Sequence, residues 1–268
     1  MSTPSETPLQ PHLTPAQSEA FARDGFLIMR QLANVERIAA MRSLTFDHLE
    51  RGIEPIEYEA DVAYPGAPAS RDAAGGDTAR RLLAAYQRDH WFSEWAADAR
   101  LTAIVAQLLN SPDVWFTPNH HNCVMTKAPR FSTATAWHRD LRYWSFQTPH
   151  LVNAWLALGD EHPANGCMRL LPGSHRLTLD AARFDEARFL REDEPANAEL
   201  IASAVEAELA PGDVLFFDAG LFHAAGANTT EERKLAVVTS YFGRDNAPIP
   251  GTHSARAPAI HVREESHA

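Results

Sequence analysis

Cysteine is scarce in this sequence, and long apolar segments are missing from it. The two cysteines, Cys123 and Cys167, need not pair, and a reducing compartment suits them, so we expect a cytoplasmic location. No stretch of 18 apolar residues occurs, and the Ser-, Pro- and Thr-rich start lacks the apolar core of a signal peptide. Neither a membrane span nor a secretory leader is predicted.

Basic residues are also fewer than acidic residues. The chain has 24 Lys and Arg against 35 Asp and Glu, a formal net charge of −11 and a pI near 5.6. Nucleic acids are bound by concentrated basic patches, so this balance argues against such a partner. Hydrophobic residues make up 45% of the 268 residues, enough to bury a substantial core, and we expect a single domain over residues 1–268. The sequence does not indicate an oligomeric state.

The first part of the chain carries mostly helical patterns. A polar, Pro-rich segment at residues 1–13 is typical of a loose terminus. Thr14 and Pro15 indicate a helix start, and Gly25 a helix end. Residues 61–77 lack periodicity and indicate a long loop, equally consistent with a lid or a simple connector. We predict helices over residues 14–25, 34–50, 77–88 and 98–110, and a strand over 26–29.

Beyond residue 113 the pattern changes to short β-strands separated by turns. Such strands favour a mainly β fold with flanking helices, a double-stranded β-helix or cupin-like jelly roll that holds a ligand in its mouth. Residues 178–200, rich in Asp, Glu, Arg and Ala, interrupt the strands, and we interpret them as an insertion with some helix over the mouth. The predicted strands cover 114–116, 122–127, 151–158, 168–171, 205–209, 214–217 and 235–242.

Two histidines and one carboxylate form a candidate metal site. His138 and Asp140 flank Arg139, and in an extended strand alternate residues face the same side. His223 follows an apolar segment that a Pro-Gly-Asp turn introduces at 211–213. Two His and one carboxylate on one face of Fe(II) leave positions open for O₂ and a chelating organic cosubstrate. A Zn-dependent hydrolase or isomerase on the same barrel is an alternative use of these ligands.

The order of the motifs is more specific than any one of them. About one His-x-Asp triplet is expected by chance in a chain with 13 His. Here the triplet is followed by Asn165-Gly-Cys and Pro172-Gly-Ser-His, then by Pro211-Gly-Asp, and finally by His223 with Arg233. This ordered set resembles the phytanoyl-CoA dioxygenase family of Fe(II)- and 2-oxoglutarate-dependent oxygenases, from about residue 24 to residue 241.

The resemblance implies a metal site and a reaction. His138, Asp140 and His223 would bind Fe(II), and Arg233 would pair with the far carboxylate of 2-oxoglutarate. The implied reaction uses O₂, releases succinate and CO₂, and oxidises a C–H bond of the substrate at the iron centre, without a separate acid or base. Some relatives that halogenate have a small residue in place of the triad carboxylate, so the presence of Asp140 favours hydroxylation.

Other candidate cosubstrate contacts follow from the same resemblance. Trp155 lies near a position where the family has a Trp beside the cosubstrate. Arg80 or Arg81 falls where related enzymes have a Lys that reaches into the pocket, with Arg81 as our assignment. Adjacent His120 and His121 would point to opposite faces of a strand, so at most one of them is expected to face the pocket.

Side chains near the triad are candidates for binding a substrate. Arg142 shares the strand parity of His138 and could reach an anionic group, or form an exposed salt bridge. Trp137 and Tyr143 are candidate pocket residues, although aromatic side chains near strands also build cores. The expected partner is a small organic molecule, which nothing in the chain identifies, and no nucleotide-binding fingerprint for CoA is visible. A catalytically silent binding module is the remaining alternative.

Overall fold

The computed structural model describes residues 12–62 and 64–264, so almost all of the predicted loose terminus lies outside the described residues. Its helices are α1 Pro15–Asp24, α2 Val35–Glu50, α3 Ala85–Arg88, α4 His90–Ala96, α5 Ala99–Leu108 and α6 Pro195–Ile201. Its strands are β1 Phe26–Met29, β2 Ile56–Tyr58, β3 Ala79–Leu83, β4 Val114–Phe116, β5 Asn122–Lys127, β6 Thr135–His138, β7 Val152–Ala157, β8 Met168–Leu170, β9 Val205–Ala207, β10 Val214–Asp218, β11 His223–Ala225, β12 Lys234–Gly243 and β13 Ile260–Arg263.

Three of the predicted helices are confirmed, and their caps show why they begin and end where they do. The Thr14 side chain accepts from the backbone N–H of Gln17 in a capping box, and Gly25 ends α1 in the left-handed conformation at φ +81°. Asn34 caps α2 and Asp98 caps α5 in the same side-chain-to-backbone manner. These signals are local, so the sequence alone places them.

The prediction of a helix over residues 77–88 is wrong for most of the segment. Residues 79–83 form strand β3, and only the last part of the segment is helical, as α3. The Ala-, Arg- and Leu-rich composition favours a helix, but β3 pairs with β2 on one side and β5 on the other, and that pairing overrides the local propensity. Arg80 and Leu82 of this strand are buried, with exposed fractions of 3% and 0%.

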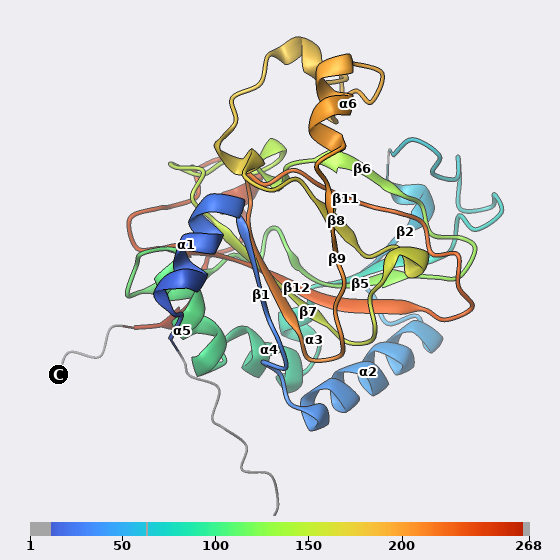
Figure 1. Ribbon diagram of the computed structural model, residues 1–268. Helices are drawn as coiled ribbons and strands as arrows, with labels where there is room; N and C mark the ends of the chain where they lie inside the picture. The colour runs from blue at the N-terminus through green and yellow to red at the C-terminus, as the bar shows by residue number, and fades with distance from the viewer. Residues whose placement is uncertain (1–11, 63, 265–268) are drawn as a thin grey trace, which may run out of the picture.

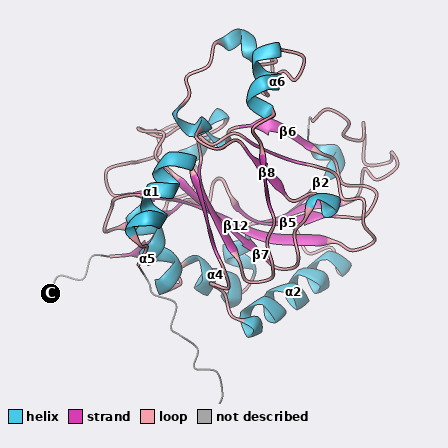
Figure 2. Cartoon of the chain, viewed as in Figure 1, coloured by secondary structure: helices cyan, strands magenta, loops and turns pink. Residues whose placement is uncertain are grey.

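The described strands form two facing antiparallel sheets, as the jelly-roll prediction requires (Figures 1 and 2). The larger sheet has the order β1-β10-β7-β12-β5-β3-β2, with β4 and β13 attached through β12. The smaller sheet has the order β6-β11-β8-β9. All seven predicted strands beyond residue 113 are confirmed, within two residues at each end.

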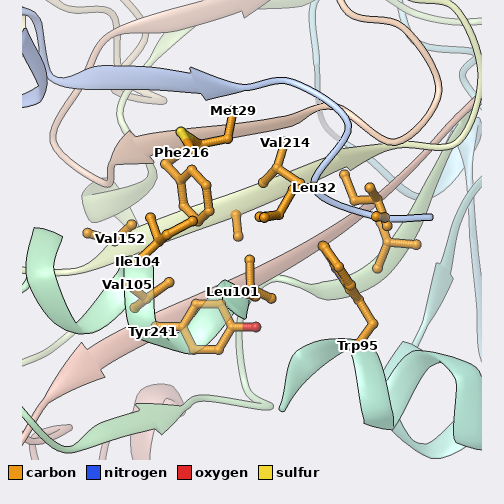
Figure 3. Close-up of a cluster of buried hydrophobic side chains, with 14 of the residues drawn as sticks. Met29, Leu32, Trp95, Leu101, Ile104, Val105, Val152, Val214, Phe216 and Tyr241 are labelled. Atoms are coloured by element: carbon orange, nitrogen blue, oxygen red, sulfur yellow. The ribbon is translucent and has the colours of Figure 1, made fainter. Parts of the chain in front are cut away.

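Alternation along the larger sheet separates a helix-facing surface from an interior surface. Val152, Ala154 and Leu156 of β7 belong to the core that α2, α4 and α5 cover, whose residues Trp95, Leu101, Ile104 and Tyr241 appear in Figure 3. The intervening residues, Asn153, Trp155 and Ala157, face the smaller sheet instead. This second surface lines the space between the sheets, where the candidate site lies.

The predicted insertion at 178–200 contains a short 3₁₀ turn and α6, and it covers the outer face of the smaller sheet (Figure 1). Its apolar residues, including Phe184 and Leu190, pack with Trp137 and Phe222 on that face. Among the described residues, no helix is both long enough and apolar enough to span a membrane.

Candidate active site

Two strands of the smaller sheet bring the predicted ligands together. His223 of β11 lies directly opposite His138 of β6 in the antiparallel register. Arg139 continues the extended backbone beyond β6, so Asp140 returns to the side of His138. One ligand atom from each of His138, Asp140 and His223 lies within 4.8 Å of the others, and all three residues are buried. The Arg139 guanidinium points away and stacks 4.1 Å from the Phe222 ring centre.

Hydrogen bonds orient both imidazoles for a metal. Nδ1 of His138 lies 2.9 Å from the carbonyl oxygen of Ala136, and Nδ1 of His223 lies 3.0 Å from that of Leu221. A carbonyl oxygen only accepts, so each Nδ1 carries the proton and each Nε2 keeps its lone pair. Both Nε2 atoms face the same oxygen, Oδ1 of Asp140, at 3.8 and 3.7 Å. The donor set therefore fits a divalent transition metal.

The charges around Asp140 keep these groups in their metal-binding forms. Burial lowers the pKa of His138 and of His223, which favours neutral imidazoles. Burial alone would raise the pKa of the Asp140 carboxyl, but the charge of the neighbouring His121 holds it well below its usual range. His121 Nε2 lies 3.1 Å from Asp140 Oδ1, and although burial opposes it, this carboxylate raises the pKa of His121 to about 10.

Asn153 of β7 fixes the orientation of the triad carboxylate from the opposite sheet. Its Nδ2 donates to Oδ2 of Asp140 at 2.7 Å, and its own Oδ1 accepts from the Ser240 hydroxyl. Asn153 and Ser240 are fully buried. Oδ1 of Asp140 is thereby left to face the imidazoles of His138, His223 and His121.

We expect Asn153→Ala to weaken Fe(II) binding by about 10- to 100-fold, because the carboxylate loses the bond that orients it. The dissociation constant, measured by competition with a coloured chelator under anaerobic conditions, checks this. Asn246→Ala is a matched control, since it also removes a buried side-chain amide, one that donates to the backbone oxygens of Thr148 and His150, away from the triad. Equal iron affinities for the two variants would contradict a role for Asn153.

Two cavities lie beside the triad and share His138 in their walls. The inner cavity lies between the sheets and extends from His138 and His223 to Lys127 and Thr135. The outer cavity, of about 700 Å³, opens toward the surface beside Asp140. Its walls include both adjacent histidines, His120 and His121, together with Tyr64, Tyr143 and Trp144. Both histidines reach it because they precede β5 in a turn rather than in a strand, which corrects the expectation that only one could.

The structure brings some predicted cosubstrate residues to the inner cavity and not others. Trp155 and Arg81 line it. Arg233 does not: its guanidinium lies on the helix-facing side of the larger sheet, where Nη1 is 3.3 Å from Oγ1 of Thr126. The physical reason is alternation, because the next residue, Lys234, turns inward, where its side chain is buried to 3% exposure.

The predicted substrate residues are also divided. Tyr143 lines the outer cavity. Trp137 is 1% exposed and packs in the core behind the smaller sheet, away from both cavities. Arg142 lines neither cavity, and its strand parity does not apply because Asp140–Arg142 is a 3₁₀ turn. Its guanidinium lies 3.8 Å from the Phe189 ring centre.

The two long irregular segments meet beside the site. Tyr64, from the loop predicted over 61–77, packs edge-on against Phe189, from the insertion at 178–200, with ring centres 5.5 Å apart. The Phe189 ring is in turn 5.9 Å from that of His138. Both segments therefore contribute to the wall over the triad.

Sequence reasoning missed several residues of the site. Lys127 and Asn153 lie on predicted strands, and nothing in their local pattern distinguishes them from ordinary polar residues. Glu161 was missed too; it accepts from Trp155 Nε1 and from Lys234 Nζ, both at 2.8 Å. Parity could have indicated them only once the direction of their neighbours was known, since Trp155 adjoins Leu156 and Lys234 adjoins Leu235, both of which face the helices.

Comparison with known proteins gives one family and a consistent fold. The family model described as phytanoyl-CoA dioxygenase (PhyH) matches residues 21–236. An ectoine dioxygenase of Halomonas elongata is 27% identical over 96% of this chain and 78% of its own length. A probable phytanoyl-CoA dioxygenase of Caenorhabditis elegans is 22% identical over 87% of this chain and 76% of its own length.

Solved structures share the architecture. EctD from S. alaskensis, solved with 2-oxoglutarate and 5-hydroxyectoine, has a TM-score of 0.73 at 20% identity, covering 94% of this chain and 87% of that chain. The epimerase SnoN, solved with Fe³⁺, α-ketoglutarate and nogalamycin RO, has a TM-score of 0.70 at 22% identity, covering 94% and 95%. At these identities the likeness establishes the jelly-roll fold.

Proposed function

The chain belongs to the phytanoyl-CoA dioxygenase family, and on that premise we propose that it is an Fe(II)- and 2-oxoglutarate-dependent dioxygenase that hydroxylates a C–H bond of a small organic molecule. The observation that carries the proposal is the arrangement of the three candidate metal ligands. His138, Asp140 and His223 present their ligand atoms within 4.8 Å of one another, and both Nε2 atoms keep a free lone pair.

The residues of the chain bind and orient the reactants. When bound, Fe(II) and 2-oxoglutarate together supply the oxidation of the C–H bond by O₂, with succinate and CO₂ as products. The triad would hold the metal on one face, and Asp140 would balance one of its positive charges. Met125, Trp155 and Phe217 line the inner cavity with apolar surface, which keeps water away from the reaction.

The outer cavity is the proposed substrate site. Its size, about 700 Å³, lies in the range of small-molecule sites, and its walls combine aromatic rings with the ion pair of Arg81 and Glu57, whose Nε and Oε1 atoms are 3.1 Å apart. Tyr143 and Trp144 would contact the substrate. The curated relatives carry names for chemically different substrates, ectoine and phytanoyl-CoA, so the family membership supports the reaction rather than one substrate.

Anaerobic reconstitution tests the proposed function. The protein is loaded with Fe(II), 2-oxoglutarate is added, and the weak visible charge-transfer band of the chelate is recorded. A band, followed by O₂-dependent release of succinate that increases with a substrate from a panel including ectoine, supports the dioxygenase. Tightly bound Zn, no band and no succinate would overturn it in favour of a zinc enzyme.

We also propose a cytoplasmic location. Cys123 and Cys167 are buried and unpaired, and a reducing compartment protects both thiols and a ferrous ion from oxidation. Immunoblotting of cell fractions tests this, and recovery of the protein outside the cytoplasm would contradict it.

A further inference from the structure

The far end of the inner cavity is positively charged, although Arg233 does not reach it. Three non-histidine cations line this cavity, namely Arg80, Arg81 and Lys127. Arg80 Nη1 lies 2.9 Å from Glu59 Oε2, and Arg81 is paired with Glu57. Lys127 is different, since none of the described carboxylates lies within ion-pair distance of its ammonium.

The partners of Lys127 leave one donor free. Nζ donates to the carbonyl oxygen of Gly226 at 2.7 Å and to that of Thr133 at 3.2 Å. An ammonium has three N–H donors, so one remains for a ligand. The Thr135 hydroxyl accepts from Arg80 Nη2 at 2.8 Å, and its own proton is likewise free to be donated into the cavity.

The neighbouring buried lysine, Lys234, does not offer a ligand an uncompensated charge. Lys234 lies opposite Lys127 in the sheet register, but its Nζ is 2.8 Å from Glu161 Oε2 and does not line the cavity. Glu161 is fully buried. The charge of Lys234 is therefore already compensated, and that of Lys127 is not.

The separation between Lys127 and the triad suits a five-carbon dicarboxylate. Gly226, whose carbonyl Lys127 contacts, lies three residues beyond His223, so their Cα atoms are at most about 10 Å apart, and closer where the irregularity between His223 and Ala225 shortens the strand. That spacing is of the order of the length of 2-oxoglutarate. The 2-oxo acid end would then chelate the metal while the other end meets the uncompensated cation.

We propose that the ammonium of Lys127, rather than the guanidinium of Arg233, holds the far carboxylate of 2-oxoglutarate, with the Thr135 hydroxyl as a second donor. The proposal rests on the proposed function. It names a positioning contact that decides which 2-oxo acid the site accepts.

The protonation of Lys127 supports this assignment. Burial first, and then the charges of Lys234 and Arg80, lower the pKa of Lys127 to about 7, against the weaker opposing effects of Glu59 and Glu161. A bound carboxylate would raise that pKa. At pH 8, binding of 2-oxoglutarate is therefore expected to take up about one proton, and its affinity is expected to fall as pH rises above 7.

Comparing two 2-oxo acids tests the proposal. 2-Oxoglutarate and 2-oxopentanoate chelate a metal in the same way, but the second lacks the far carboxylate. We expect the Fe(II)-loaded wild type to bind 2-oxoglutarate about 100-fold more tightly under anaerobic conditions. Lys127→Met is expected to remove most of this preference, whereas Arg233→Met is expected to keep it. Fe(II) affinity and melting temperature establish that each variant is folded.

The outcomes distinguish a failure of the Lys127 assignment from a failure of the proposed function. Loss of the preference in Arg233→Met, alone or to the same degree as in Lys127→Met, would overturn the assignment of Lys127. Wild-type protein that binds Fe(II) but neither 2-oxo acid would instead overturn the proposed function itself.

A second measurement uses the wild type and does not depend on a folded variant. Calorimetry of 2-oxoglutarate binding at pH 8, in two buffers of different ionisation enthalpy, gives the number of protons taken up. About one proton supports the proposal. Binding without proton uptake at any pH from about 6 to 10 would overturn it, and Lys127→Met, if folded, should show none.

Discussion

The substitution Asp140→Ala is expected to abolish O₂-dependent turnover of 2-oxoglutarate, mainly because the protein no longer retains iron. Loss of a residue that merely orients a ligand weakens metal binding by about 10- to 100-fold, so loss of the ligand itself is expected to exceed about 100-fold. The two imidazoles remain oriented by the carbonyl oxygens of Ala136 and Leu221, but they lose the charge that faces them. Iron content after gel filtration and succinate release together measure the effect.

Controls separate the loss of a ligand from the loss of the fold. Asp47→Ala removes an aspartate that is half exposed and pairs with Arg51 on the surface of α2, so it should leave both iron content and turnover unchanged. Asp140→Asn keeps the size of the side chain and is expected to bind iron poorly as well. If Asp140→Ala retained a full equivalent of iron, the carboxylate would not be a ligand.

The triad was predictable because much of its geometry is local. His138 and Asp140 are two residues apart in extended backbone, which fixes their common direction, and this holds although Asp140 begins a 3₁₀ turn. The position of His223 opposite His138 depends on the pairing of β11 with β6. No local pattern encodes that register, and the order of the motifs served in its place.

The alternation of side chains along a strand also explains why the prediction for Arg233 failed. Arg233 and Lys234 are adjacent, and the sequence does not show which of them faces the interior. A shift of one residue exchanges the two faces of a strand. In this protein the register turns Lys234, and not Arg233, toward the interior. The helix predicted over 77–88 failed for a related reason, because the pairing of β3 with β5 is set by residues some forty positions away.

The second large effect concerns stability. Lys234→Met is expected to lower the free energy of unfolding by about 3–5 kcal/mol, since it leaves the carboxylate of Glu161 buried without its cation. The remaining partner of Glu161, the Trp155 indole N–H, supplies one hydrogen bond and no charge. Urea denaturation at pH 7 without cosubstrate measures the change.

We expect the effect to be large because the Lys234–Glu161 pair is buried, and two comparisons test this. Arg51→Met breaks the surface pair with Asp47 and is expected to cost at most about 0.5 kcal/mol. The double variant Lys234→Met/Glu161→Gln removes both charges and should recover a large part of the stability that Lys234→Met loses, because the cost arises from the uncompensated carboxylate rather than from a missing attraction. A loss below about 1 kcal/mol in Lys234→Met, or no recovery in the double variant, would show that Glu161 finds compensation elsewhere in the folded protein.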